Sequence, residues 1–172
     1  QEFADTDSTV AVNTAPKING ELNLDMNEDG TIVIRDTQIL ALVTDEPGSF
    51  VAVTSLTVSC GTLTQIAAGT WAFTPDQNFN GSLDVTFSVS DREFTVNGTG
   101  SIDVAAVNDA PVATDDTDAV TEDFTISGTL ADHASDVDNE ADELTYSIVG
   151  DTPAGFVLTN VNGSYTFDAS SY

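Results

Sequence analysis

Closely spaced carboxylates are the side chains in this sequence whose types and spacing could do chemistry. Asp136 and Asp138 stand two residues apart, and Asn108 precedes Asp109, with Pro111 two residues further on. Carboxylates this close repel each other unless a cation lies between them. Calcium binds six to eight oxygens from carboxylates, amides and carbonyls, and a proline stiffens the backbone that presents them. These two segments therefore suit calcium.

The sequence contains few of the residues that catalytic sites usually need. The single histidine, His133, lies in an acidic stretch, and the sequence contains no Gly-x-Ser-x-Gly motif. With Cys60 as the single cysteine, neither an intrachain disulfide nor a multi-thiolate metal site can form. A glycosidase-like carboxylate pair is possible by residue type, but so acidic a chain contains such pairs by chance. We therefore expect no enzyme.

Charge limits the partners that this chain can bind. Lys and Arg total 3 against 29 Asp and Glu in 172 residues, which gives a formal net charge of -26. Such a surface repels phosphate backbones and anionic lipid, so we expect no nucleic acid and no membrane as partners. The 40% of hydrophobic residues is enough for a folded core.

Alternation of apolar and polar residues marks the elements that must position these side chains. Residues 82–90, 101–104 and 143–148 alternate with a period of two, as strands with one wet face require. Shorter runs rich in β-branched and aromatic residues lie at 31–34, 50–53, 70–73, 156–158 and 164–167. No segment has a clear helical pattern. The sequence predicts an all-β fold of short antiparallel strands.

An internal repeat divides the chain into two parts. The segments 13–16, 28–29 and 69–73 recur at 108–111, 122–123 and 163–167, each displaced by about 94 residues. This period suits a sandwich of about 100 residues. We predict a linker or the end of a preceding repeat over 1–13, a first sandwich over 14–107 and a second over 108–172.

The second sandwich is predicted to be incomplete. By the repeat, Tyr172 corresponds to about Asn78, so the second part has no equivalents of the strands at 82–90 and 94–106. Inner-face residues and strand edges would then be exposed. Two explanations stay open: the chain is cut short, or another polypeptide supplies strands by β-augmentation.

Several motifs carry a resemblance to a known family. The segment 105–112 is similar to the linker between tandem bacterial cadherin-like repeats, and residues 71–76 and 78–81 resemble the tandem-95 or cadherin-like repeat. The second part, through residues 128–130, 136–138 and 165–167, looks more like the VCBS-type repeat. The resemblance covers nearly everything after about Asn13.

This resemblance implies tandem Ig/cadherin-like β-sandwiches from a large secreted or surface adhesin. In such proteins the repeats extend a terminal binding domain away from the cell, and some take part in biofilms. Calcium at the repeat junctions restricts bending. We therefore expect an extracellular or cell-surface spacer, with the neighbouring repeats of the same polypeptide as its partners.

Residues on both sides of the boundary would hold that calcium. The predicted ligands are Glu28, Asp91, Asn108, Asp109, Asp136 and Asp138. Each of them could instead be a solvated or turn-capping residue. At the other end of the first part, the second part's Asp-x-Asp pattern falls near 43–46, where Val43 replaces one acidic position, so calcium is less expected there.

Two other functions remain open from the sequence. The chain could be a module that binds a glycan or a surface protein, using Trp71 or exposed aromatic residues, although Trp71 alternates like a core residue. Alternatively, the open second sandwich could accept strands from a neighbouring chain and so form a homo-oligomer or filament.

Overall fold

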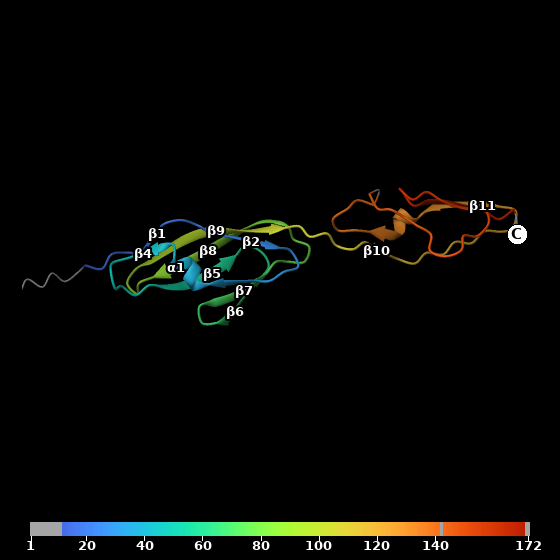
Figure 1. Ribbon diagram of the computed structural model, residues 1–172. Helices are drawn as coiled ribbons and strands as arrows, with labels where there is room; N and C mark the ends of the chain where they lie inside the picture. Colours follow the sequence, from blue (N-terminus) through green and yellow to red (C-terminus); the bar gives the residue numbers. More distant parts are fainter. Residues whose placement is uncertain (1–11, 142, 171–172) are drawn as a thin grey trace, which may run out of the picture. The chain divides into compact units, whose positions relative to one another are not determined.

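The computed structural model describes residues 12–141 and 143–170, and it separates into two compact units (Figure 1). Unit 1 ends at Val107 and unit 2 begins at Asn108. Strands dominate both units, which confirms the all-β prediction. Among the described residues, neither helical segment has the length and apolar character needed to cross a membrane.

Unit 1 is a sandwich of two principal sheets. Four strands pair in the order β2-β9-β8-β5, three pair in the order β3-β7-β6, and β1 pairs with β4. The elements are β1 (Lys17–Ile18), β2 (Leu22–Asn27), β3 (Ile32–Arg35), α1 (Asp36–Leu40), β4 (Val43–Thr44), β5 (Ala52–Val58), β6 (Thr62–Ala67), β7 (Thr70–Thr74), β8 (Gly81–Ser90) and β9 (Thr95–Ala105).

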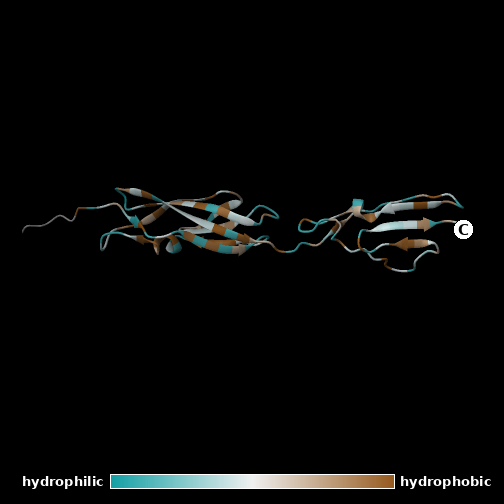
Figure 2. Ribbon diagram, turned by 90° about the horizontal axis from the view of Figure 1, so that it is seen from above, coloured by the Kyte–Doolittle hydropathy of each residue, from teal (hydrophilic) through white to brown (hydrophobic). Residues whose placement is uncertain are grey.

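The hairpin of β8 and β9 forms the centre of the larger sheet. Its register runs from Gly81 opposite Val104 to Ser90 opposite Thr95, and the two strands lie side by side along unit 1 (Figure 1). Apolar and polar residues alternate along these strands (Figure 2), because every second side chain faces the other sheet. Half of the buried core residues come from these two strands. The strand predicted over 82–90 is confirmed.

One strand pair differs from the antiparallel prediction. β2 and β9 run parallel, with Leu22 opposite Gly100 and Asn27 opposite Ala105. The two backbones approach closely at Gly100, where an added Cβ would lie 2.0 Å from the Leu22 carbonyl oxygen. A glycine is therefore required at this position for β2 to pair with β9.

Trp71 belongs to the packed part of unit 1. Its indole is partly buried against the core, and its Nε1–H donates to Asp36 Oδ1 at 3.2 Å. This placement agrees with the core interpretation of Trp71 and leaves the indole N–H already engaged.

Unit 2 contains fewer strands. Three pair in the order β11-β14-β13, and β10 pairs with β12. The elements are β10 (Val112–Ala113), β11 (Thr125–Thr129), the short 3-10 helix η1 (Leu130–His133), β12 (Ala134–Ser135), β13 (Phe156–Leu158) and β14 (Ser164–Asp168).

The two units share one arrangement of these elements. In unit 1, Ile32 of β3 lies opposite Phe73 of β7, and in unit 2 Ile126 of β11 lies opposite Phe167 of β14, each 94 positions later. The pair β10-β12 repeats the pair β1-β4, and η1 stands where α1 stands. The repeat seen in the sequence is thus a repeat of strand pairing.

The larger sheet of unit 1 has no counterpart in the described part of unit 2. Residues 115–121 and 143–149 occupy the chain positions of β2 and β5, yet neither segment forms a strand. The strand predicted over 143–148 is therefore wrong for this structure. In unit 1, β2 pairs with β9 and β5 pairs with β8, and residues 108–141 and 143–170 contain no equivalent of β8 or β9.

Unit 2 consequently leaves much of its apolar surface uncovered. Among its described hydrophobic residues, Tyr165 and Ala169 are buried. Phe124, Val157 and Val149 are exposed, the last to 96%. These side chains therefore face solvent in the described part of unit 2.

Candidate cation-binding loops

Acidic side chains gather at the end of unit 1 where its chain begins. Asn13 Nδ2 donates to Asp91 Oδ2 and to Glu93 Oε2, each at 3.0 Å. The Thr14 backbone N–H donates to Glu46 Oε1 at 2.7 Å, and the Thr14 hydroxyl donates to the same oxygen. At this end, therefore, the first residues of the unit contact both the loop after β4 and the turn between β8 and β9.

Asp45 and Glu46 form a crowded carboxyl pair in this group. Asp45 Oδ2 and Glu46 Oε2 are buried oxygens without a hydrogen-bond partner. The neighbouring Glu46 carboxyl, together with burial, raises the pKa of Asp45, whereas the proximity of Asp45 and the hydrogen bond from the Thr14 hydroxyl lower the pKa of Glu46 to about 2. Such a pair has electrostatic repulsion that a cation would relieve.

Asp91 is buried, with 8% of its surface exposed. Its Oδ1 accepts from the backbone N–H groups of Phe94 at 2.6 Å and Glu93 at 2.8 Å. These hydrogen bonds, above all the one from the Phe94 N–H, hold the pKa of Asp91 below its usual range. Asp91 therefore closes the turn between β8 and β9 as an ionised carboxylate.

Glu28 lies at the opposite end of unit 1. Only 2% of its surface is exposed, its N–H donates to the Ala105 carbonyl at 2.9 Å, and its Oε1 accepts from the Val107 N–H at 2.7 Å. This carboxylate fixes the backbone where unit 1 ends.

One calcium ion cannot take both Glu28 and Asp91, so the six predicted ligands do not form a single cage. Asp91 adjoins Thr95, where β9 begins, and Glu28 adjoins Ala105, where β9 ends. A strand of this length spans about 33 Å at roughly 3.3 Å per residue. The prediction failed because β8 runs back towards the beginning of the unit and carries Asp91 with it.

The structure does bring the four ligands predicted in unit 2 together. The Asp109 N–H donates to Asp138 Oδ2 at 2.6 Å, and the N–H groups of Asp138 and Asn139 donate to Asp136 Oδ1 at 2.9 and 3.1 Å. Asn108 Nδ2 donates to the Asp109 carbonyl at 2.6 Å. The segment that opens unit 2 is thus tied to the loop after β12.

The same loop is built in both units. In unit 1 the Thr14 N–H donates to a carboxylate in the loop after β4, as the Asp109 N–H does in the loop after β12. The strand registers place Thr44 opposite Lys17 and Ser135 opposite Val112, so the residues that follow, Asp45 and Asp136, are equivalent.

The alignment that placed Val43 at an acidic position of this pattern is therefore wrong. Val43 lies within β4, Asp45 corresponds to Asp136, and Pro47 stands where unit 2 has Asp138. The paired strands in unit 2 are separated by four fewer residues than those in unit 1. A single sequence offset consequently misaligns the two loops.

The candidate ligand atoms in both loops are oxygens, which suit calcium better than zinc or copper. Among the described residues, however, no three His, Cys, Asp or Glu side chains already converge on a point where a metal ion could sit. A cation would therefore be bound by drawing carboxylates of one loop together, with amide and backbone oxygens completing its shell.

Comparison with known proteins follows the same division of the chain. The family described as cadherin-like domain matches residues 12–105, which is more than half of the sequence. The chain belongs to the cadherin-like domain family. Residues 108–172, which resemble a VCBS-type repeat in sequence, match the family described as bacterial Ig domain. The cadherin-like unit is thus followed by an Ig-like one, and both families are typical of surface or extracellular proteins.

Solved structures show only distant similarity to the cadherin-like chain. The endo-fucoidan hydrolase MfFcnA4 (H294Q variant), from glycoside hydrolase family 107, is 21% identical at a TM-score of 0.39, over 88% of this chain and 24% of the hydrolase. The related MfFcnA9 is 18% identical at a TM-score of 0.34, over 90% and 29%. The Ig1-2 module of the Drosophila receptor protein tyrosine phosphatase DLAR is 12% identical at 0.29, over 91% and 85%. Among curated proteins, none matches this chain in sequence.

Sequence reasoning missed four members of the polar group at this end of the cadherin-like unit, namely Asn13, Asp45, Glu46 and Glu93. Asn13 had a signal, because the repeat equates it with Asn108, which was predicted as a ligand. Asp45 and Glu46 had none that spacing alone could supply, since only the strand register aligns them with the loop of unit 2.

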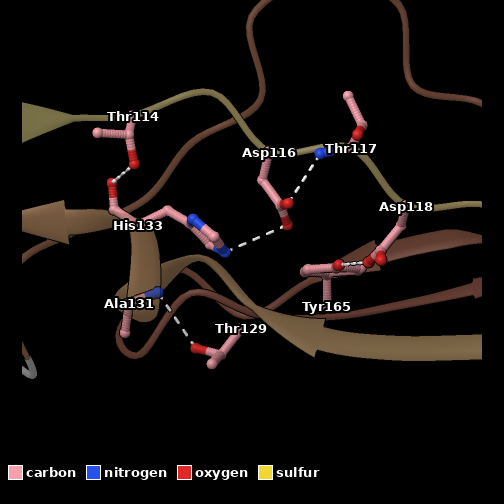
Figure 3. A network of polar contacts seen from close by, with 8 residues as sticks. All are labelled: Thr114, Asp116, Thr117, Asp118, Thr129, Ala131, His133 and Tyr165. Carbon is pink, nitrogen blue, oxygen red and sulfur yellow. Dashed lines mark hydrogen bonds and ion pairs between the residues drawn. The ribbon is translucent and has the colours of Figure 1, made fainter.

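A second polar network crosses unit 2 (Figure 3). His133 Nε2 lies 3.3 Å from Asp116 Oδ2, and the Tyr165 hydroxyl donates to Asp118 (Figure 3). Thr114 Oγ1 donates to the His133 carbonyl at 3.3 Å. These contacts hold residues 114–118 against η1 and β14.

We expect Tyr165 to titrate later than an ordinary tyrosine. Asp118, which accepts the hydrogen bond from the hydroxyl, raises the pKa of Tyr165 from 10.0 to about 12. The neutral phenol is favoured in the folded state, so this contact stabilises unit 2 below pH 10 and the stabilisation is lost as the pH rises through 12. Tyrosinate absorbance followed against pH measures this.

The control is Tyr165→Phe, which should remove the titration near pH 12. If Tyr165→Phe instead removed a titration at the ordinary pH of a tyrosine, the hydrogen bond from Tyr165 to Asp118 would be absent in solution.

Proposed function

We propose that this chain is a structural spacer of a bacterial surface or secreted adhesin, whose repeats are stiffened by calcium and support cell adhesion or biofilm formation. The observation that carries the proposal is the acidic loop that opens each unit in the same way, with an N–H from the first segment bound to a loop carboxylate. The cadherin-like and bacterial Ig families support the adhesin setting.

In this proposal each unit binds calcium with its own residues. In unit 2 the ligands are Asn108, Asp109, Asp136 and Asp138. In unit 1 they are Asn13, Asp45, Glu46 and Asp91, two of which carry the buried oxygens without partners. The ion would supply the positive charge that these carboxylates lack, since the chain has 3 basic residues in total.

Stiffening would follow from where unit 2 places its loop. Calcium there fixes the backbone of Asn108 and Asp109, the residues that come directly after Val107. Glu28 already fixes Val107 from within unit 1 without any ion. The backbone on each side of the boundary would then have little freedom, which is the property that a spacer needs.

A role as a spacer requires no catalysis, and we propose none. A role as a glycan-binding module through Trp71 is not favoured, because its indole packs on the core and its Nε1–H is bound to Asp36. Together with the spacer role, we propose that the chain lies outside the cell or on its surface.

Calorimetric titration of the chelator-stripped chain with calcium tests the binding step. We expect saturable binding, and at least about tenfold weaker binding at the unit 2 site in the double variant Asp136→Asn/Asp138→Asn, because calcium loses two charged oxygens. The matched control, Asp115→Asn/Asp151→Asn, removes the same charge from exposed positions of unit 2. Equal weakening in both variants would mean that calcium responds only to net charge.

Small-angle scattering of the same samples tests the spacer step. Calcium is expected to narrow the distribution of end-to-end distances in the unaltered chain and in the control, but not in Asp136→Asn/Asp138→Asn. An unchanged distribution together with saturable binding would refute stiffening while leaving the calcium site standing.

A further inference from the structure

The longest uncharged stretch of the sequence forms three strands of unit 1. Residues 47–75 contain no Asp, Glu, Lys or Arg, although these residues make up 19% of the chain, and the next longest such stretch covers residues 152–167. The long stretch contains β5, β6 and β7. Two copies of a chain with a net charge of -26 repel each other, so they can approach most closely where carboxylates are absent.

The two principal sheets of unit 1 have four edge strands, and three of them carry a feature that discourages pairing with another chain. β2 carries the charge of Asp25, β3 carries that of Arg35, and α1 lies against β5. The fourth edge strand, β6, has the sequence TLTQIA, without charge or proline. In the part of the chain that the structure describes, its one extensive contact is with β7.

The edge of β6 is accessible to a partner. β6 forms the outer strand of its hairpin with β7, at the margin of unit 1 (Figure 1). Five of its six residues are exposed, Ile66 to 58%. Its pairing with β7 is regular from Thr62 to Gln65 and shifts register between Gln65 and Ala67. The regular part therefore offers main-chain N–H and C=O groups on the side away from β7.

A row of threonines leads to this edge. The hydroxyls of Thr31 and Thr74 share a hydrogen bond of 2.7 Å, and Thr74 lies opposite Thr62 of β6. When a second β6 lies antiparallel to the first, about a two-fold axis at Leu63, its Thr64 lies opposite Thr62 of the first copy and continues the row. Cross-strand threonine pairs stabilise sheets, so β6 is complementary to itself.

We propose that β6 is an interface through which two copies of this chain associate, with their β6 strands paired antiparallel around a two-fold axis at Leu63. The two three-stranded sheets then become one continuous sheet in the order β3-β7-β6-β6-β7-β3. Main-chain hydrogen bonds between the two β6 strands provide the affinity. The uncharged surface of the strand keeps the carboxylates of the two copies apart.

Charge favours a second copy over a different protein as the occupant. A basic partner would be drawn to the carboxylate-rich surfaces of the chain, and β6 offers it no charge. An acidic partner gains from the absence of charge, and a copy of this chain also supplies the matching threonines. The interface uses none of the proposed calcium ligands, so it stands or falls separately from the spacer proposal.

Sedimentation equilibrium of the full chain in chelating buffer tests the association. We expect a monomer–dimer equilibrium whose association constant rises at least about tenfold when NaCl is raised from about 0.02 M to about 0.5 M, because salt screens the repulsion between copies. Thr64→Glu places a carboxylate on the edge and should weaken the dimer at least about tenfold. The matched control, Thr37→Glu, adds the same charge at an exposed position of α1 and should leave the dimer unchanged.

A mixing experiment checks the pairing of the two strands. Thr64→Glu mixed with Thr62→Lys should associate at least about tenfold more tightly than Thr64→Glu alone, because the two opposite charges face each other across the pair. Circular dichroism verifies that each variant keeps its fold.

Amide hydrogen exchange of the unaltered chain locates the contact without any substitution. Protection of the amides from Thr62 to Gln65 should rise with chain concentration, together with the dimer. A chain that stays monomeric at high salt would overturn the proposal, as would a dimer that Thr64→Glu leaves unchanged or that both glutamate variants weaken equally. Protection of β6 that does not depend on concentration would also overturn it, since another segment of the same chain would then cover the edge.

Discussion

Replacing Phe87 by alanine is expected to destabilise unit 1 by about 3–5 kcal/mol, the cost typical of removing a buried aromatic ring. Phe87 is 1% exposed in the middle of β8. Its ring lies against Gly98 so closely that an added Cβ there would be 2.4 Å from it. Because a domain of this size is stable by roughly 5–15 kcal/mol, the loss should bring unit 1 close to unfolding.

Urea unfolding followed by tryptophan fluorescence measures this loss. Trp71 is the single tryptophan of the chain and packs on the core of unit 1, so the signal reports this unit alone. Ser82→Ala, an exposed substitution on the same strand, is the control and should change stability by less than about 0.5 kcal/mol. A Phe87→Ala loss no larger than that of the control would contradict the packing described here.

Replacing Glu28 by alanine is expected to cost roughly 1.5–3 kcal/mol, the usual value of a hydrogen bond to a charged group. Glu28 is almost wholly buried, and its Oε1 accepts from the Val107 N–H at 2.7 Å. Without it, the last backbone N–H of unit 1 loses its partner. The unfolding free energy and the exchange rate of the Val107 amide should therefore change together.

Glu28→Gln separates the hydrogen bond from the charge. Glutamine keeps the acceptor oxygen and removes the negative charge, so it should preserve the protection of the Val107 amide. If glutamine and alanine exposed this amide equally, the charge of Glu28 rather than its hydrogen bond would hold the end of the unit, and a cation partner would become the better explanation.

The sequence predicted strands well where one face is buried and the partner strand lies in the same unit. The alternation over 82–90 became β8 because β5 and β9 flank it. The equally regular alternation over 143–148 formed no strand, because the described part of unit 2 offers it no ladder partner. Periodicity describes what a segment can pair with, and pairing itself depends on residues far away in the sequence.

The candidate site was predicted in part for a similar reason. Asn108, Asp109, Asp136 and Asp138 meet as expected, since strand β10 and the loop after β12 belong to one local pairing. Asp91 was assigned to the wrong end, because its position depends on the direction of β8 across the whole sandwich. Local spacing contains no information about that direction.

The parallel pairing of β2 with β9 has a mechanical consequence. β2 is near the beginning of unit 1, β9 is its last strand, and the two are joined from Leu22 opposite Gly100 to Asn27 opposite Ala105. Tension applied to the two ends of the unit would slide these strands along each other. All the bonds between them would then be loaded at once, whereas in a peeling hairpin they break one after another. Unit 1 is thus built to resist stretching along the direction in which its chain enters and leaves.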